Sequence, residues 1–415
     1  MGWMIPFLKD DLINIKGAGV IPIGINKQFT IDENGNQILK RRLTHDASRP
    51  RISGTSINSL CDKDQLDDYQ YPYCLMRLLH QIHFWRALHP LIPILINKYD
   101  LDSAYRRLHV LLQFALLCIT IIGQIAYLLL RLPFGTTPAA ERFCTVSETI
   151  ADLTQAIVDD NTWDPNTLHS DLSDLIPEEE CPTTLKALQQ QPFHLMVQPQ
   201  HKNIKVDVYI DDIVTLVLAL NKKLIERAKH GAPLALHSVF RPVCKNESIP
   251  RNAILSLRKL LGEGKLSEIK NTLGWIINTR LFTISLEEEK FLRWNKEIKD
   301  LIASCKPTTS SVLESIIGKI NHAAFIIPLI RYFLTRLRYR LKVITKEGNQ
   351  NLTAWDKADL KLISDMLHHS CYRGIRIDHI TFCYPSLFTA SDASEHGLGG
   401  FCSEYLLGDS NYLFI

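Results

Sequence analysis

Two adjacent aspartates, Asp211 and Asp212, interrupt an otherwise apolar and β-branched run at residues 206–217. If this run formed one continuous buried strand, both carboxylates would lose their hydration, which is costly unless the charges are compensated. A tight hairpin centred on the pair would instead place both carboxylates at its tip, where hard cations such as Mg²⁺ can bind them. The alternative for so short a motif is an Asp-Asp turn between surface strands, without a chemical role.

A third carboxylate, Asp100, ends a second apolar run at residues 92–99 and precedes Tyr105 by five positions. If this run is a strand beside the Asp211 hairpin, the three carboxylates converge and could hold two Mg²⁺ ions for phosphoryl transfer. Asp102 would lie on the same face of the strand one step further on, and we expect it to have a structural role. For Tyr105 the alternative is an ordinary core aromatic.

Length and composition predict a folded chain of two to three domains, since 46% of its 415 residues are hydrophobic and 22% are charged. The formal charge of +3 does not by itself indicate a polyanionic partner. The 10 cysteines show no CxxC spacing, which favours reduced thiols in an intracellular protein. The charged opening, MGWMIPFLKDDL, does not fit a secretory signal. We therefore expect a protein of the cytoplasm or nucleus that is not secreted.

The uncharged segment at residues 110–130 is long enough to cross a bilayer as a helix. Polar and small residues interrupt it, however, and Arg131 follows at once. The alternative is a pair of buried strands joined near Gly123, because strands buried on both faces are continuously apolar. We expect the strands and no membrane association.

The remaining pattern predicts a mixture of strands and helices. Short apolar runs between turn signals indicate hairpins at residues 17–58. The acidic segment that follows Asp159 is typical of a surface insertion. Cys74, His80 and His83 have a spacing that could hold zinc, but helix packing is favoured there. Helical spacing is expected at residues 75–88, from Pro138 to Ile157, at 253–261 and at 312–343.

In order and spacing, these motifs resemble those of reverse transcriptases of retroelements, of the LTR or DIRS-like type, across roughly residues 18–345. Each motif alone is a weak signal, and their order makes the combined signal strong. The matching segments are KRRLTHDASRP with SINSL (residues 40–50 and 56–60) for the fingers motif, residues 100–105 for the A motif, LPFGTTPAAERFC (132–144) for the B motif, YIDD (209–212) for the C motif and residues 273–275 for the primer grip.

The resemblance implies an α+β fold of the right-hand polymerase type. It has an antiparallel palm sheet, fingers built from the N-terminal strands and the helix at residues 75–88, and a helical thumb. The domains expected from it are fingers and palm at 1–295, thumb at 296–346, a connection-like segment at 347–386 and an RNase H-like start at 387–415.

The resemblance also implies an RNA- or DNA-directed DNA polymerase that binds a primed template and dNTPs and uses two Mg²⁺ ions, with Mn²⁺ as a possible substitute. Asp100, Asp211 and Asp212 would be the catalytic metal ligands. Tyr105 would exclude a 2′-hydroxyl, and Gly135 would allow the backbone to approach the template base pair. The other residues assigned by the resemblance are Arg42 and Phe134 at the dNTP, Leu273, Gly274 and Trp275 as primer grip, and one of Lys259, Lys265 and Lys270 as the lysine of the D motif.

A basic segment at residues 330–346 supplies the expected nucleic-acid surface, because Lys and Arg contacts to phosphates give affinity without sequence preference. A solvated helix face with extended arginines is the alternative. The residues assigned to nucleic-acid contacts are Arg331, Arg336, Arg338 and Arg340.

Near the C-terminus, Asp392 within SDAS and the glycines that follow resemble the first strands of an RNase H domain. That activity needs further carboxylates on later elements, so we expect a truncated domain without RNase H activity. The main alternative to a polymerase is a decayed retroelement copy that binds nucleic acid without catalysis. The sequence does not indicate an oligomeric state.

Overall fold

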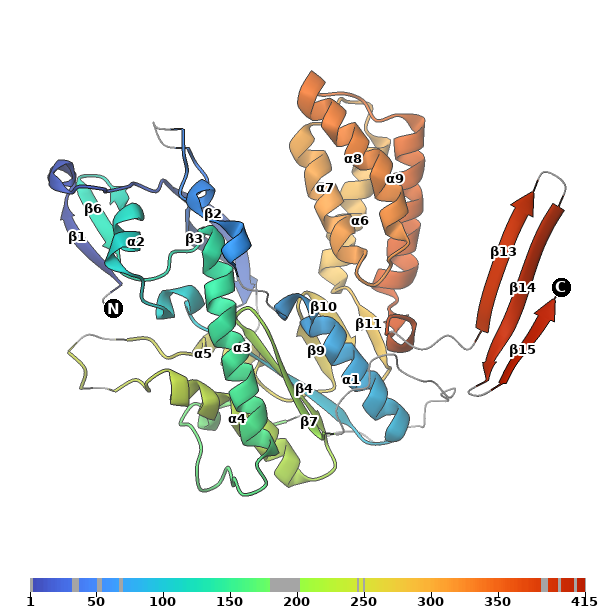
Figure 1. Ribbon diagram of the computed structural model, residues 1–415, viewed down its shortest axis with the longest axis horizontal. Coiled ribbons are helices and arrows are strands. Elements are labelled where there is room, and N and C mark those ends of the chain that lie inside the picture. Colours follow the sequence, from blue (N-terminus) through green and yellow to red (C-terminus); the bar gives the residue numbers. More distant parts are fainter. Residues whose placement is uncertain are drawn as a thin grey trace.

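The structure, a computed structural model, is a mixed α and β protein with antiparallel sheets (Figure 1). This confirms the expected mixture of helices and antiparallel sheets. The residues that it describes are 3–31, 37–50, 54–66, 70–179, 202–244, 246–248, 251–381, 387–394, 397–406 and 409–414.

The central sheet has three antiparallel strands in the order β4 (Ile94–Asp100), β8 (Asp212–Leu218) and β7 (Ile204–Tyr209). Both faces of β4 and β8 are buried, and alternate residues enter different cores. Ile94 and Ile96 join one core, whereas Leu95 and Tyr99 join the other. A shift of one residue in register would exchange the two sets, so the two-sided burial fixes the pairing of the strands.

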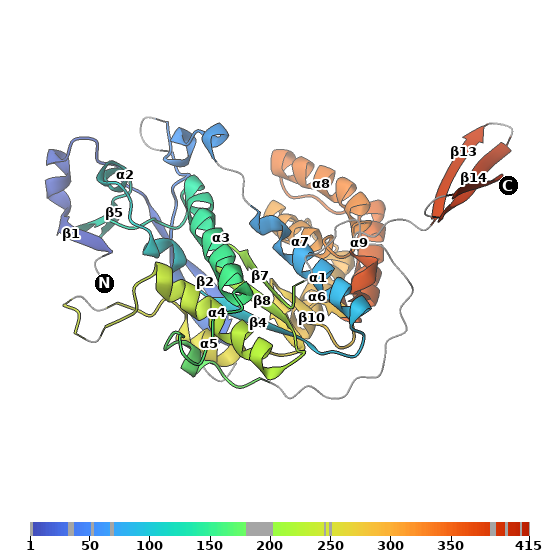
Figure 2. The same cartoon turned by 60° about the horizontal axis from the view of Figure 1, so that its bottom comes forward.

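Two long helices cover one face of this sheet and lie side by side in both views (Figures 1 and 2). They are α3 (Thr137–Asp159), with Pro138 in its first turn as expected, and α4 (Lys222–Val239). The helices approach closely at Gly231, where an added Cβ would collide with the Val158 side chain.

Helix α1 (Cys74–Leu88) contributes to the core on the other face of the central sheet. Arg77 donates two hydrogen bonds to Asp207 of β7, and the fully buried Arg86 donates to the carbonyls of Pro90, Ile92 and Thr279. The helix expected at residues 75–88 is therefore present, and it packs on the central sheet.

The histidines of α1 have partners of their own. Nδ1 of His80 contacts the Met76 carbonyl, and Nδ1 of His83 contacts the Thr381 hydroxyl. Among the residues that the structure describes, no group of three or more His, Cys, Asp or Glu side chains is arranged to hold a metal ion. The contacts of His80 and His83 are typical of histidines in a packed helix.

The segment at residues 110–130 forms three short elements. Helix α2 (Leu112–Leu117) precedes the strands β5 (Thr120–Ile122) and β6 (Ile125–Leu129), which turn at Gly123. The expected turn is confirmed, while the expectation of a strand over residues 112–117 is wrong. Within the described ranges, no helix is long and apolar enough to cross a membrane.

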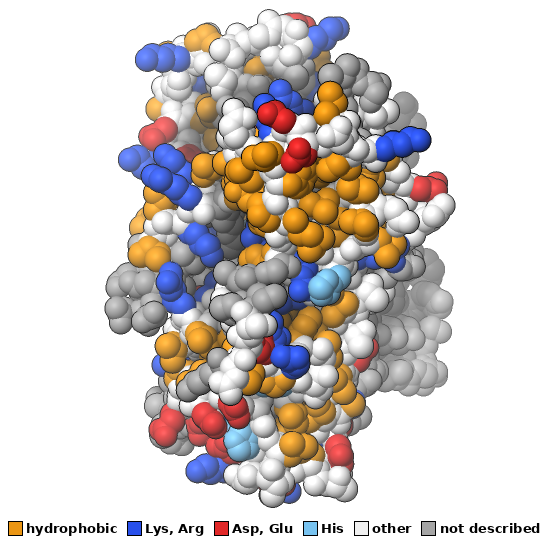
Figure 3. Space-filling model, turned by 90° about the vertical axis from the view of Figure 1, so that its left-hand side faces the viewer, with side chains coloured by type: hydrophobic (Ala, Val, Ile, Leu, Met, Phe, Trp, Pro, Cys, Tyr) orange, Lys and Arg blue, Asp and Glu red, His pale blue; other side chains and the backbone are white. Residues whose placement is uncertain are grey.

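The N-terminal strands form two further antiparallel pairings. Strand β1 (Met4–Leu8) pairs with β6, and β2 (Ile23–Ile31) pairs with β3 (Gln37–His45) in the expected hairpin. Apolar side chains gather on the face shown in Figure 3, the side of the molecule where Figure 1 places β1, β6 and α2. The exposed apolar side chains of these elements and their flanks include Ile5, Leu8, Leu111, Leu112 and Ile122.

A small sheet and four helices follow the central sheet and share its larger core. The sheet has the order β12 (Ile375–Arg376), β11 (Thr283–Ser285), β10 (Trp275–Asn278) and β9 (Ile269–Thr272). The helices are α6 (Glu288–Ala303), α7 (Ser310–Ala323), α8 (Ile330–Glu347) and α9 (Ala354–Met366), with a π-helical turn at Leu367–Tyr372. Helix α9 packs on both α6 and α8. The domain boundaries expected at 296 and 347 stay predictions.

The last strands form an antiparallel sheet in the order β13 (Leu387–Ser394), β14 (Gly397–Leu406) and β15 (Asp409–Phe414), apart from the helical bundle in both views (Figures 1 and 2). Asp392 pairs with Gly399 along the backbone. The side chain of Asp392 lies outside the described part of the chain, so its role as a metal ligand stays a prediction.

The carbonyls held by Arg86 generate a prediction about stability. Arg86→Met would leave three carbonyls without their donor, and we expect the free energy of unfolding to fall by about 3 kcal/mol. Arg331→Met, at an exposed position on α8, should change it by less than about 0.5 kcal/mol. Urea denaturation followed by tryptophan fluorescence measures both. Equal changes in the two variants would contradict the role assigned to Arg86.

Candidate catalytic site

The expected hairpin is present, and its turn consists of Ile210 and Asp211, since Tyr209 pairs directly with Asp212. Ile210 has φ of +55°, a left-handed conformation that costs a β-branched residue about 1–3 kcal/mol. Its side chain packs against the core beneath α3 and α4, and this contact helps to offset the strain. Asp211 thus lies in the turn, and Asp212 is the first residue of β8.

Asp100 and Asp212 face each other at the ends of adjacent strands, because β4 pairs with β8 in the register that aligns them. Burial raises the pKa of Asp212 to about 7, and the charges of Asp211 and Asp100 oppose its ionisation further, while Lys98 partly offsets both effects. The structure therefore brings the three predicted carboxylates to one end of the central sheet.

Two lysines lie among these carboxylates. Lys259, on helix α5 (Leu257–Glu263), donates to Oδ1 of Asp100, and Nζ of Lys98 lies 2.9 Å from Oε2 of Glu263 on the same helix. Burial alone would lower the pKa of Lys98, but the charges of Asp212, Glu263 and Asp100 outweigh it and raise the pKa. Sequence analysis missed Lys98, because a lysine inside an apolar run carries no motif of its own.

Two of the lysines that could be the D-motif lysine, Lys259 and Lys270, have different partners. Lys259 reaches the carboxylates, whereas the buried Lys270 donates to the carbonyls of Glu263 and Lys265. Helix α5 itself begins four residues later than expected, at Leu257. Lys259 therefore contacts a predicted metal ligand, Asp100.

The donor set has the chemistry that a hard divalent cation prefers, since three carboxylates supply only oxygen ligands. The crowding that raises the pKa of Asp212 is a charge imbalance that such a cation would relieve. In the conformation seen here, however, Lys259 engages Asp100, and the described side chains include no group of three ligands arranged around a metal. The residues fit Mg²⁺ by type and position but are not assembled around it.

Tyr105 lies in a 3₁₀ helix at Ala104–Arg107, just beyond the end of β4. Its ring contacts Phe134 and Phe143 edge-on, with centroids 5.6 and 5.4 Å apart. Burial, followed by the charge of Asp211, raises the pKa of Tyr105. Phe143 is fully buried and Phe134 is 50% exposed, so Tyr105 lies between the core and the surface beside the carboxylates.

Gly135 has φ of +104°, and an added Cβ would collide with the carbonyl oxygen of His45 at the end of β3. Asn58 holds the same turn from the opposite side. It donates to the Gly135 carbonyl at 3.1 Å and accepts from the Thr137 backbone at 2.7 Å. The turn before α3 is therefore fixed by two distant segments, and Asn58 is a positioning residue that the sequence pattern did not distinguish within SINSL.

Arg42 lies in β3, where its backbone pairs with Asn26. Its side chain lies outside the described part of the chain. The role of Arg42 at the dNTP stays a prediction.

The predicted primer grip forms a tight turn between β9 and β10, with positive φ at Leu273 and Gly274. The side chain of Trp275 is buried and stacks on His322, with ring centroids 4.8 Å apart. Lys290 of α6 also donates to the Gly274 carbonyl at 3.2 Å. The ring of Trp275 thus joins the turn to the helical bundle, and the role of residues 273–275 as primer grip stays a prediction.

The four arginines predicted to contact nucleic acid do not share one environment. Arg340 is paired at 3.0 Å with Asp356, which is fully buried, and Arg336 is paired at 3.1 Å with Asp359. Both pairs join α8 to α9, and contact of these two arginines with nucleic acid stays a prediction. Arg331 and Arg338 are exposed, and Arg338 donates to Asn321.

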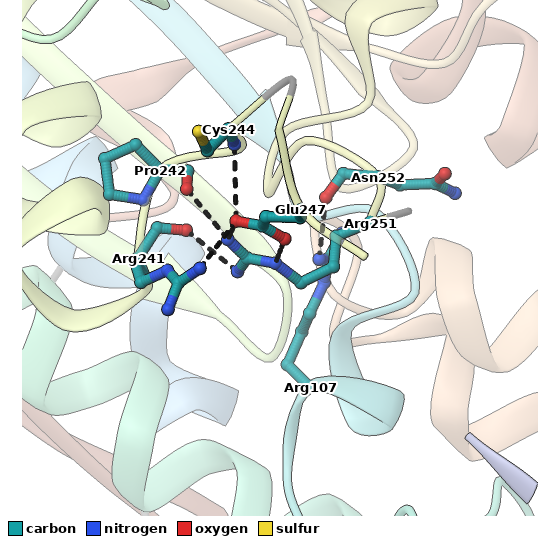
Figure 4. A network of polar contacts seen from close by, with 7 residues as sticks. All are labelled: Arg107, Arg241, Pro242, Cys244, Glu247, Arg251 and Asn252. Atoms are coloured by element: carbon teal, nitrogen blue, oxygen red, sulfur yellow. Dashed lines mark hydrogen bonds and ion pairs between the residues drawn. The ribbon is translucent and has the colours of Figure 1, made fainter. Parts of the chain in front are cut away.

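A polar network joins the segment after Asp100 to the loop at residues 241–252 (Figure 4). Arg107 donates to the carbonyls of Asp102, Asn252 and Ala253. Within the loop, hydrogen bonds from Arg251 and Arg241 lower the pKa of Glu247 to about 2. Asp102 also accepts from Asn252 at 3.3 Å, a contact of the structural kind expected for it.

Gly135 generates a prediction about this turn. Gly17 is a matched control, because it also has positive φ (+81°) but has nothing within 4 Å of an added Cβ. Gly17→Ala should cost only the left-handed backbone, about 1 kcal/mol, whereas Gly135→Ala must also displace the His45 carbonyl. We expect a clearly larger fall in melting temperature for Gly135→Ala. Equal shifts would show that the contact with His45 does not constrain the turn.

No protein-family model and no curated protein matches this chain. Solved structures of foamy viral protease-reverse transcriptase are similar to it. The structure named dRH, in complex with ds DNA, has a TM-score of 0.48 and 15% identity over 94% of this chain. The complex with an RNA/DNA hybrid has a TM-score of 0.48 and 16% identity over 97% of this chain. The chain spans 51% and 42% of the lengths of those two chains.

Proposed function

We propose that this chain is the polymerase core of a retroelement reverse transcriptase, of the LTR or DIRS-like type, which copies a primed RNA or DNA template into DNA. The observation that carries the proposal is the convergence of Asp100, Asp211 and Asp212 at one end of the central sheet. The order of the five sequence motifs supports the same function, because they belong to one reaction.

The proposed architecture follows from the elements described above. The central sheet with α1, α3 and α4 is the palm, and the N-terminal strands are the fingers. The bundle of α6 to α9 is the thumb, extended beyond the boundaries expected from sequence, and β13 to β15 are the RNase H-like start. The site would work inside the cell, in the cytoplasm or the nucleus.

Asp100, Asp211 and Asp212 would hold two Mg²⁺ ions, or Mn²⁺ in their place. The bound ions would acidify a primer 3′-hydroxyl and neutralise charge on the triphosphate. The chain's own residues position the substrates around this centre. The turn at Gly135 would present backbone to the nascent base pair, and the ring of Tyr105, which contacts Phe143, would lie against the sugar of a dNTP.

The thumb would contribute the nucleic-acid contacts. Arg331 and Arg338 are exposed cations of α8 that could contact phosphates, whereas Arg336 and Arg340 also form ion pairs with α9. The Leu273–Gly274 turn would meet the primer strand through its backbone. Its position depends on Lys290 and His322, which tie it to α6 and α7.

The second candidate is a decayed copy that binds nucleic acid without polymerising. One observation favours it, namely the engagement of Asp100 by Lys259 where a polymerase needs a free ligand. The intact set of three carboxylates favours the polymerase. The two candidates differ in catalysis and agree in binding.

Primer extension separates the candidates. With poly(rA)–oligo(dT), dTTP and Mg²⁺, we expect the wild type to extend the primer and Asp211→Asn to lose at least about a hundredfold in rate, as expected for loss of electrostatic stabilisation. Asp211 lies in a turn, so the variant should fold and still bind the primed template. Equal inactivity of both proteins, with binding retained, would establish the decayed copy.

Tyr105 provides a test of the sugar position. Removal of the ring in Tyr105→Ala should raise the incorporation of ribonucleotides relative to deoxynucleotides. Tyr105→Phe keeps the ring and its contacts with Phe134 and Phe143, and should leave the ratio near that of the wild type. Single-nucleotide incorporation kinetics with dTTP and UTP measure the ratio. An unchanged ratio in Tyr105→Ala would contradict the assignment.

A further inference from the structure

Two ion pairs join helix α5 to strand β4 side by side. Lys98 and Asp100 are two residues apart on the strand, and their partners Glu263 and Lys259 are four residues apart on the helix. Two strand residues span roughly 6.6 Å and four helical residues roughly 6 Å, so the spacings match. The charges alternate, because the strand offers a cation and an anion and the helix offers their complements.

Only one of the two ion pairs includes a predicted metal ligand. Asp100 belongs to the carboxylate site, so its partner Lys259 is a cation placed at a metal ligand. Lys98 and Glu263 form a second pair, in which the lysine side chain is 12% exposed, against 26% for Lys259. A cation that binds the carboxylates therefore competes with Lys259 and leaves the Lys98–Glu263 pair in place.

Further contacts hold α5 against β4 independently of Lys259. Leu260 is buried in the core with Leu255 and Leu266. The Ser256 backbone donates to the Asp100 carbonyl at 3.0 Å, and Ser267 exchanges two backbone hydrogen bonds with Ile96. Loss of one ion pair would therefore release the lysine side chain without releasing the helix.

We propose that Lys259 is the internal counter-cation of Asp100, which a divalent cation must displace, and that the Lys98–Glu263 pair retains α5 during the exchange. This inference rests on the proposed function, since it assigns Asp100 to a cation site. It accounts for the lack of an assembled metal-ligand group among the described residues, because the site is closed by its own lysine.

Cation affinity of the nucleotide-free chain tests the exchange. Mn²⁺ binding is measured from the electron paramagnetic resonance signal of the free ion. Lys259→Met should bind Mn²⁺ about two- to fivefold more tightly than the wild type, as expected for loss of one partly exposed competing pair. The control is Arg258→Met, which removes the same charge from the neighbouring, exposed position of α5 and should leave the affinity unchanged. Lys259→Met that binds no more tightly than Arg258→Met, or no binding by any variant, would overturn the inference.

Hydrogen exchange tests the retaining pair. Glu263→Gln should increase amide exchange across Leu257–Glu263, and Mn²⁺ should increase it further in this variant but not in the wild type. If Glu263→Gln exchanges its amides at the rate of the wild type both with and without Mn²⁺, the retaining role of the Lys98–Glu263 pair is refuted.

Primer extension is scored separately. If Lys259→Met binds Mn²⁺ more tightly but no variant extends a primer, the proposed polymerase function is refuted and the counter-cation role of Lys259 stands. If the wild type extends a primer but Lys259→Met binds Mn²⁺ no more tightly, only the counter-cation role is refuted.

Discussion

The pairing of Asp100 with Asp212 concentrates negative charge at the end of two buried strands, and much of the structure compensates for it. The pairing is enforced by the burial of both faces of β4 and β8, which leaves the carboxylates no alternative register. Desolvation then opposes their ionisation. Lys98 and Lys259 supply positive charge at this point. The core therefore determines where the carboxylates lie, and the two lysines reduce the electrostatic cost of burying them there.

The features that could be predicted from sequence are those set by local pattern. The Asp211–Asp212 hairpin follows from two carboxylates in an apolar run, and α3 follows from Pro138 and the helical spacing after it. The segment at residues 110–130 shows the limit of this reasoning, because a short apolar run is compatible with a helix or a strand. Its first part became α2 and only the second part became a hairpin.

The features that could not be predicted depend on partners far away in the chain. The motif at residues 273–275 marks a turn correctly, but the burial of Trp275 depends on His322 of α7. Likewise, an arginine at 340 looks available for phosphate until α9 supplies Asp356. A one-dimensional pattern indicates which residues are charged or aromatic, and only the tertiary packing decides which of them face solvent.

The site therefore combines a fixed backbone turn at Gly135 with an ion pair, Lys259–Asp100, whose cation can be exchanged. Gly135 lies so close to the His45 carbonyl that a Cβ has no room there, and its own carbonyl accepts a hydrogen bond from Asn58. Lys259 is held to Asp100 by a charged hydrogen bond at the end of a flexible stem, which permits another cation to replace it. A binding site needs both properties, because the substrate requires a rigid surface while the charge must be rebalanced when a cation enters. The fixed and the exchangeable contacts meet at the end of β4, where backbone pairing between strands stops and side-chain ion pairs begin.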